Sequence, residues 1–237
     1  MPLTITAAKE TVEAFPELEV RLVVAEGVRN AEAWPDAESN LSALEDRLGA
    51  GQWHPFDAES ERIASWHEAY RRFGTNPRRI RPSVDALGRR LEKSGRLPRI
   101  NGCVDTYNYV SVLYGLPAGA FDLDHIDTDV QIRFGRAGDA FTPLGEPDAV
   151  EQPNAGEVVY AAGSLVLTRH WNHRDCDQTK VTEESKRIVF MLERVSSAAA
   201  DSEMMAEAQN RLAELIAAHT DKVSTPFLEA SSPSVVL

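Results

Sequence analysis

The spacing of apolar residues changes at Leu116-Pro117, and this change constrains the fold more than any other feature of the chain. Before it, apolar residues mostly recur at three- or four-residue steps, which is typical of amphipathic helices. After it, short β-branched runs alternate with loops that contain Gly, Pro or Asp, which is typical of strands. The helices expected from this pattern span residues 38–48, 59–73, 83–94, 104–114 and 198–219. The expected strands span residues 18–25, 130–134, 157–161, 164–168 and 187–193.

This order of elements predicts an α+β fold, with a mixed sheet, packed helices and a C-terminal helix in a single domain. Residues 1–60 would form the N-terminal strand and helix part, residues 61–195 the core, and residues 196–237 the C-terminal helix and tail. The last residues, 229–237, are expected to be poorly ordered, as chain ends commonly are.

Composition points to a cytoplasmic protein. No apolar run approaches the roughly 18 residues that a membrane-spanning helix needs, and the first residues lack the basic start and apolar stretch of a secretory signal. The two cysteines, Cys103 and Cys176, form no CxxC pair, and a reducing compartment suits them. No membrane partner is therefore expected, and the oligomeric state is left open.

The net charge of −12 argues against general nucleic-acid binding and against DNA as a partner. One segment has the opposite charge: residues 71–99 carry ten basic and two acidic side chains. It would suit a local contact with an RNA backbone, or it could be an ordinary surface paired with the acidic remainder. The candidates for RNA binding are the arginines of this segment near its two turns and helix: Arg78, Arg79, Arg81, Arg89 and Arg90.

Polar residues gather at two places that could form a pocket. Asp105 and Asn108 share one face of the helix at 104–114, where they would line a pocket or anchor turns. Residues 169–179 form the densest polar cluster, which could line the pocket, bind a metal or be a solvated loop. The spacing of its His, Asp and Cys residues matches no zinc site, and no glycine-rich nucleotide loop occurs, so neither a metal nor another cofactor is expected.

Two single residues carry structural expectations. Ser83 follows Pro82 and is expected to be the N-cap of its helix. Trp171 is expected in the core, as most tryptophans are, although it could also stack on a base.

A colinear set of motifs resembles the B3/B4-type (tRNA-binding, editing) domain of the phenylalanyl-tRNA synthetase beta subunit. The similarity covers residues from about 71 to 193, most specifically from Val104 to Asp122. The motifs are Arg81-Pro82-Ser83, Pro98, the run from Val104 to Val110, Gly115-Leu116-Pro117 and Ala120-Phe121-Asp122. The resemblance implies a freestanding B3/B4-like domain that acts on, or binds, the charged acceptor end of tRNA.

In this family the implied reaction is hydrolysis of the ester of a mischarged tRNA, which requires a positioned carbonyl, an aligned water and a stabilised oxyanion. The resemblance places Asp177, or alternatively Asp175, at the family's acidic position. Asn108 is the other catalytic candidate. The candidates for substrate binding lie in the turn after the helix, at the start of a strand and in the polar cluster: Pro117, Gly119, Glu157 and Asn172.

Gly119 stands where the family has a histidine, so two further functions stay open. The first is a noncatalytic tRNA-binding module that keeps the basic segment. The second is a hydrolase of small amino-acid esters or amides, which the overall acidity favours.

Overall fold

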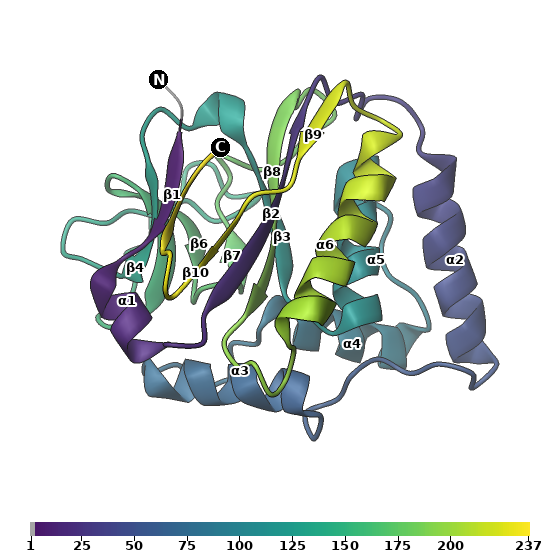
Figure 1. The fold of residues 1–237 in the computed structure, drawn as a ribbon, viewed down its shortest axis with the longest axis horizontal. Coiled ribbons are helices and arrows are strands. Elements are labelled where there is room, and N and C mark those ends of the chain that lie inside the picture. Colours follow the sequence, from purple (N-terminus) through teal and green to yellow (C-terminus); the bar gives the residue numbers. More distant parts are fainter. Residues whose placement is uncertain (1–2) are drawn as a thin grey trace.

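Two β-sheets pack face to face, and helices cover the outer face of one of them (Figure 1). The structure is a computed structural model, and it describes residues 3–237. The expected α+β class is confirmed. The division of the chain at residues 60 and 195 stays a prediction, and the N-terminal strand Glu19–Glu26 lies inside a sheet with strands from the other parts.

The first sheet has six strands, of which only β1 and β4 run parallel. Its order is β11 (Ser234–Val236), β1 (Thr4–Ala7), β4 (Val130–Phe134), β5 (Val158–Ala162), β6 (Leu165–Arg169) and β7 (Arg174–Asp175). The second sheet is antiparallel and has five strands. Its order is β10 (Phe227–Glu229), β2 (Glu19–Glu26), β8 (Arg187–Arg194) and β3 (Ala118–Asp122), with β9 (Lys222–Ser224) also paired to β2.

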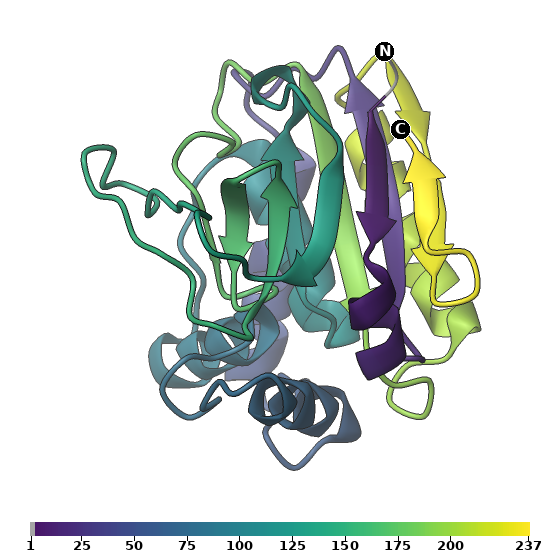
Figure 2. The same cartoon turned by 90° about the vertical axis from the view of Figure 1, so that its left-hand side faces the viewer.

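The helices are arranged in layers outside the five-stranded sheet and beneath both sheets (Figures 1 and 2). Helices α5 (Gly102–Tyr114) and α6 (Ser202–Ala217) pack on the sheet, and α2 (Pro35–Gly49) packs on α5. Helices α3 (Glu61–Arg72) and α4 (Ser83–Ser94) lie at the lower end of the molecule in both views. The short helices α1 (Lys9–Ala14) and η1 (Leu123–His125) lie beside the six-stranded sheet and β3. Of the helices in residues 3–237, none has the length and apolar character needed to cross a membrane.

Strand β8 shows how the sequence builds two cores on one sheet. Successive side chains of a strand point to opposite faces. Ile188, Phe190 and Leu192 therefore face α5 and α6, whereas Val189 and Met191 face the other sheet. By the same alternation Glu193 points between the sheets, so a carboxylate ends an otherwise apolar face.

The helices and longer strands agree with the spacing of apolar residues, but two expectations are wrong. The C-terminal residues are ordered, because β10 and β11 complete the two sheets and Val236 pairs with Thr4 of β1. Ser83 does not cap its helix: it is the first helical residue after Pro82, and its Oγ is buried without a hydrogen-bond partner in the described structure. The sequence pattern also misses β1, β3, β7 and β9, which have two to five residues. Strands of two to four residues are too short for an alternation to be recognised, and β3, with the sequence Ala-Gly-Ala-Phe-Asp, lacks a polar and apolar alternation.

Gly102 at the start of α5 offers a test of helix packing. A Cβ there would lie 2.3 Å from the ring of Trp34, which itself stacks on His219 with ring centroids 4.0 Å apart. Gly102→Ala must therefore displace Trp34, and we expect it to lower the free energy of unfolding by about 1–3 kcal/mol, the usual cost of overpacking. Chemical denaturation measures this loss.

Gly49→Ala is the matched control, because nothing lies within 4 Å of a Cβ at this helical position. Since Gly49 is the last residue of α2, where the preference for alanine is smaller than in a helix interior, the substitution should leave the unfolding free energy unchanged or raise it by up to about 0.5 kcal/mol. Equal effects of the two substitutions would contradict the packing described for Trp34.

Candidate functional site

A cavity of about 260 Å³ lies where α4 and α5 meet the edges of the two sheets. Its walls come from α4, α5, strands β3, β5, β6, β7 and β8, and the turn between β6 and β7. Strand pairing brings these walls together: Gly119 pairs with Met191, Tyr160 with Thr168, and Thr168 with Asp175. Residues far apart in the sequence thus line one space.

The Glu193 carboxylate joins the parts of the fold beneath this cavity. It accepts hydrogen bonds from the Tyr160 hydroxyl of the opposite sheet, from Trp171 Nε1 at 3.0 Å and from Asn172 Nδ2 at 2.9 Å. Asn172 Oδ1 in turn accepts a bond of 2.8 Å from the Tyr70 hydroxyl of α3. One buried carboxylate therefore connects both sheets, the turn and a helix.

Burial raises the pKa of Glu193 to about 7, because the charged form loses its hydration. The hydrogen bonds from Tyr160, Asn172 and Trp171 oppose this effect, since each stabilises the anion. The carboxyl group therefore exchanges its proton near neutral pH.

The turn between β6 and β7 has a strained backbone. His170 and Trp171 have φ values of 49° and 70°, a region that residues with a side chain rarely adopt. Such conformations cost on the order of 1–3 kcal/mol each and persist where surrounding contacts impose them. Here Trp171 N donates to Val158 O at 2.6 Å, and His170 Nδ1 lies 2.9 Å from the Thr75 hydroxyl. The strain lets the turn present Trp171 and Asn172 to Glu193.

Asp175 supplies a carboxylate oxygen that faces the cavity. Its Oδ1 accepts a bond of 2.7 Å from the Thr168 hydroxyl, while Oδ2 has no hydrogen-bond partner among residues 3–237. A Cβ built on Gly119 would lie 4.0 Å from this Oδ2 and 3.6 Å from Met191 Cε, so the glycine leaves open space beside the oxygen. Burial raises the pKa of Asp175 to about 6, opposed by the bond from Thr168.

Two neighbouring residues of α5 add further polar groups to the wall. Asn108 is 8% exposed and Tyr107 is half-buried; within the described chain neither side chain forms a hydrogen bond. Burial raises the pKa of Tyr107, so its hydroxyl keeps its proton and can donate. The cavity thus offers an unpartnered acceptor on Asp175 and unpartnered donors on Asn108 and Tyr107.

The structure brings four of the predicted catalytic and substrate-binding residues together: Asn108, Gly119, Asn172 and Asp175 all line the cavity. Asp177 lies outside it. Its Oδ1 accepts bonds from Gly145 N at 2.9 Å and Lys180 Nζ at 2.8 Å, which lower its pKa. A carboxylate held in this way on the outside cannot reach a ligand in the cavity.

Glu157 and Pro117 are also outside the cavity wall. Glu157 is 1% exposed, and its two oxygens accept from Arg169 at 3.0 and 2.8 Å. Glu157 therefore belongs to a buried ion pair, whereas the sequence made it a candidate for substrate binding at the start of a strand. Pro117 contributes its carbonyl oxygen to the ladder with Glu193 N, directly before the cavity residues Ala118 and Gly119.

The candidate RNA-binding arginines separate into groups. Arg90 is exposed at the edge of the cavity. Arg89 lies one residue before it and pairs with buried Asp85 at 2.8 Å, while Arg81 lies 3.8 Å from the same residue. Arg78 and Arg79 are exposed in the turn after α3, where Arg78 borders a different hollow.

Sequence reasoning missed Tyr160, Met191 and Glu193 as parts of the site. A signal for Glu193 was present, because a carboxylate that closes the apolar run 188–192 must be buried with partners. The expectation that Trp171 lies in the core is confirmed, since it is fully buried, and it also borders the cavity. Among residues 3–237 no three His, Cys, Asp or Glu side chains gather as a metal site would require.

Comparisons with known proteins show which family the chain is similar to. Residues 65–221 match the B3/4 domain family. The chain is 39% identical over 85 residues to the phenylalanine–tRNA ligase beta subunit of Carboxydothermus hydrogenoformans, covering 35% of this chain and 10% of the relative. It is 32% identical over 112 residues to that of Streptococcus pneumoniae, covering 47% and 14%. The matched part is thus a small share of these relatives.

Among solved structures, an N-terminal fragment of the phenylalanyl-tRNA synthetase beta subunit from Pyrococcus horikoshii aligns with a TM-score of 0.46 and 13% identity. The alignment covers 95% of this chain and 50% of the fragment. The family and sequence matches confirm the resemblance that the motifs around Val104 to Asp122 suggested.

The raised pKa of Glu193 predicts a pH-dependent stability. The folded protein holds this proton up to about pH 7, whereas the unfolded chain releases it near 4.5. The stabilisation that the protonated Glu193 gives to the folded state is therefore fully present below pH 4.5 and is lost as the pH rises to about 7. The free energy of unfolding of the wild type, relative to Glu193→Gln, should fall across this range by up to about 3 kcal/mol, at about 1.4 kcal/mol per pKa unit.

Glu17→Gln is a suitable control, since hydrogen bonds from Ser197 lower the pKa of that exposed glutamate. The effect of Glu17 on the free energy of unfolding should be small and should increase, not decrease, as the pH rises. Urea denaturation at several pH values measures both variants. A difference between the wild type and Glu193→Gln that stays constant from pH 4 to 8 would show that Glu193 does not titrate as described.

Proposed function

Since the chain belongs to the B3/4 domain family, we propose that it binds the charged acceptor end of tRNA and hydrolyses the ester of a mischarged aminoacyl-tRNA. The observation that carries the proposal is the cavity of about 260 Å³ with unpartnered polar groups on Asn108, Tyr107 and Asp175. A space of this size suits an amino acid and excludes a nucleic-acid duplex. We place the activity in the cytoplasm, where the two buried, unpaired cysteines stay reduced.

The proposed reaction uses water as the nucleophile. Asp175 has a pKa of about 6, so it is ionised at neutral pH and can accept a proton from a water beside it. The water oxygen adds to the ester carbonyl, and the donors on Asn108 and Tyr107 stabilise the negative charge that forms on the carbonyl oxygen. The bond to the ribose oxygen then breaks, and that oxygen takes the proton from Asp175. The products are a free amino acid and uncharged tRNA.

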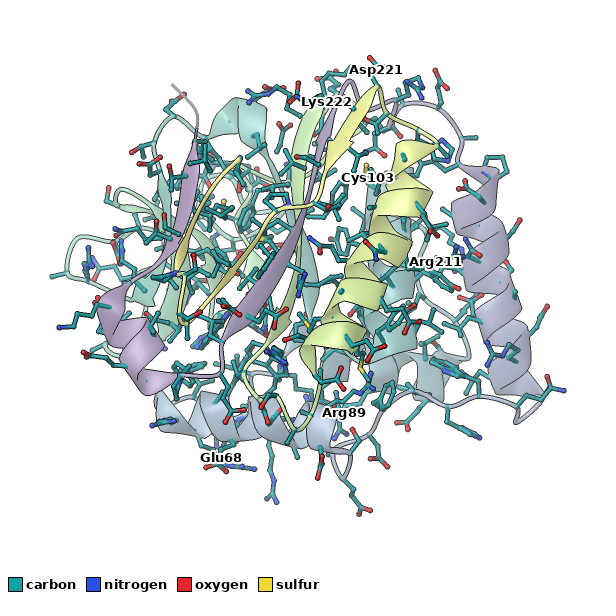
Figure 3. The ribbon with its side chains drawn as sticks, in the orientation of Figure 1. Glu68, Arg89, Cys103, Arg211, Asp221 and Lys222 are labelled. Carbon is teal, nitrogen blue, oxygen red and sulfur yellow. The ribbon has the colours of Figure 1, made fainter. Side chains whose placement is uncertain are left out.

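The side chains around the cavity support water over a covalent nucleophile. Ser83 Oγ borders the cavity but has no hydrogen-bond partner in the part of the chain described, so no base activates it. Cys103 and Cys176 are both buried, and burial raises the pKa of each thiol (Figure 3 shows Cys103 in the interior). A serine or thiol that keeps its proton is a weak nucleophile.

A noncatalytic tRNA-binding module is the second candidate. The open space beside Gly119, where the family has a histidine, favours it, because a side chain that could take part in hydrolysis is missing. In that case the cavity would hold the aminoacyl group without releasing it. A hydrolase of small amino-acid esters would use the same cavity without RNA.

Single-turnover deacylation of a panel of correctly and incorrectly charged tRNAs tests the proposal. We expect the wild type to release at least one mischarged amino acid faster than spontaneous hydrolysis, with a rate that rises with pH through about 6 as Asp175 ionises. Asp175→Asn should lower this rate by roughly 10²-fold or more, the usual contribution of a general base.

Asp177→Asn is the matched comparison, because it makes the same change two residues away but outside the cavity. Its rate should stay within about twofold of the wild type, since surface substitutions have small effects. Loss of activity in Asp177→Asn with full activity in Asp175→Asn would reverse the assignment. If the protein deacylates no charged tRNA, the proposed hydrolysis is wrong and a noncatalytic tRNA-binding module is favoured. If it hydrolyses only small amino-acid esters, a hydrolase that acts without RNA is favoured.

A further inference from the structure

A second hollow, open and strongly basic, lies beside the cavity. It has a volume of about 1130 Å³ and runs between α2 and the C-terminal part of α4 with the turn that follows; we call it the α2–α4 groove. Five basic side chains and two carboxylates line it, in a protein whose net charge is −12. They are Arg89, Arg90, Lys93, Arg96 and Arg99, with Glu38 and Glu45. Figure 3 labels Arg89 at the lower end of the molecule.

Three of these basic groups have no partner among residues 3–237. The side chains of Arg90, Lys93 and Arg96 are exposed and form no ion pair or hydrogen bond with any residue from 3 to 237. Arg90 and Lys93 are three residues apart on α4, so they share a helix face, and Arg96 follows the left-handed Gly95 that ends the helix. The groove therefore presents a row of free positive charges.

The two carboxylates offset only part of this charge, because five basic side chains line the groove and Arg99 holds both carboxylates. Its guanidinium lies 2.8 Å from Glu38 and 2.7 Å from Glu45. These contacts lower the pKa of Glu38 and keep both carboxylates turned toward Arg99. The lining of the groove therefore keeps an excess of positive charge, with five basic side chains against two carboxylates.

The groove and the cavity are neighbours. Ala86 and Arg90 of α4 belong to the walls of both. A polymer lying in the groove can therefore pass Arg90 and place its end in the cavity. With about 260 Å³ available in the cavity, a single strand can do this and a duplex cannot.

We propose that the α2–α4 groove binds the phosphates of a single-stranded RNA 3′ end through Arg90, Lys93 and Arg96, and directs the terminal nucleotide to the cavity. The inference rests on the proposed function for the identity of the RNA, which is the acceptor end of tRNA. The arginines contribute planar donors for phosphate oxygens, and Lys93 contributes a point charge.

An RNA-binding assay with uncharged RNA tests this proposal without depending on hydrolysis. The probes are a fluorescent, uncharged hairpin that reproduces a tRNA acceptor stem with its unpaired 3′ end, and the same hairpin with a blunt end. We expect Lys93→Ala/Arg96→Ala to weaken binding of the overhang hairpin at least tenfold. The plot of log affinity against log salt should become shallower by about 1.4, at roughly 0.7 per phosphate contact on a single strand. Binding of the blunt hairpin should be weaker and should not respond to the substitutions.

Lys9→Ala/Arg136→Ala is the matched control, because it removes the same charge from exposed residues on the side of α1 and β4, away from α2 (Figure 1). The affinity of this control variant for the overhang hairpin should stay within twofold of the wild-type affinity. Equal losses in the two double variants, or equal loss on both hairpins, would overturn the proposal. If the groove variant loses RNA affinity as expected while the wild type hydrolyses no charged tRNA, the groove stands and the proposed hydrolysis fails.

Discussion

The buried carboxylate of Glu193 is the interaction on which the rest of the site depends. An isolated charge between two sheets would be strongly unfavourable, so the fold must supply partners. The fold supplies Tyr160, Trp171 and Asn172 as these partners. Their hydrogen bonds to Glu193 fix the distance between the two sheets, and they also hold the strained turn after β6 in place. The energy of these hydrogen bonds helps to maintain backbone angles that the turn would not adopt alone.

The cavity follows from this arrangement. With the turn held against Glu193, β7 continues from it and presents Asp175 beside Gly119, in the cavity that Asn108 of α5 also lines. Two acidic groups with raised pKa values then lie in one region, and their environments differ. Glu193 is surrounded by donors and has a structural task, whereas one oxygen of Asp175 is free for a ligand. Division of tasks between neighbouring carboxyl groups by their surroundings is a common way to obtain a base that works near neutral pH.

The sequence predicts the helices and several site residues from local patterns. It does not predict the contacts between residues that are far apart in the chain. The helices at α2 to α5 follow from residues three and four apart, and Asn108, Gly119, Asn172 and Asp175 were expected at the site from motifs or from a polar cluster. Tyr160 and Glu193 lie 33 residues apart on different sheets, so no local pattern shows that they meet. The basic segment was visible as charge, but which side chains lack partners depended on the positions of Glu38, Glu45 and Asp85.

The proposed function depends most directly on an aminoacyl group that occupies the cavity beside Asp175. A crystal structure with an aminoacyl-adenosine analogue, in which an amide replaces the ester, tests it most directly because the bound group cannot be hydrolysed. We predict that the aminoacyl group lies between Gly119 and Asp175, with its carbonyl toward Asn108 and the adenosine toward Arg90. Binding of the analogue elsewhere on the protein, with the cavity closed or empty, would contradict the proposed function.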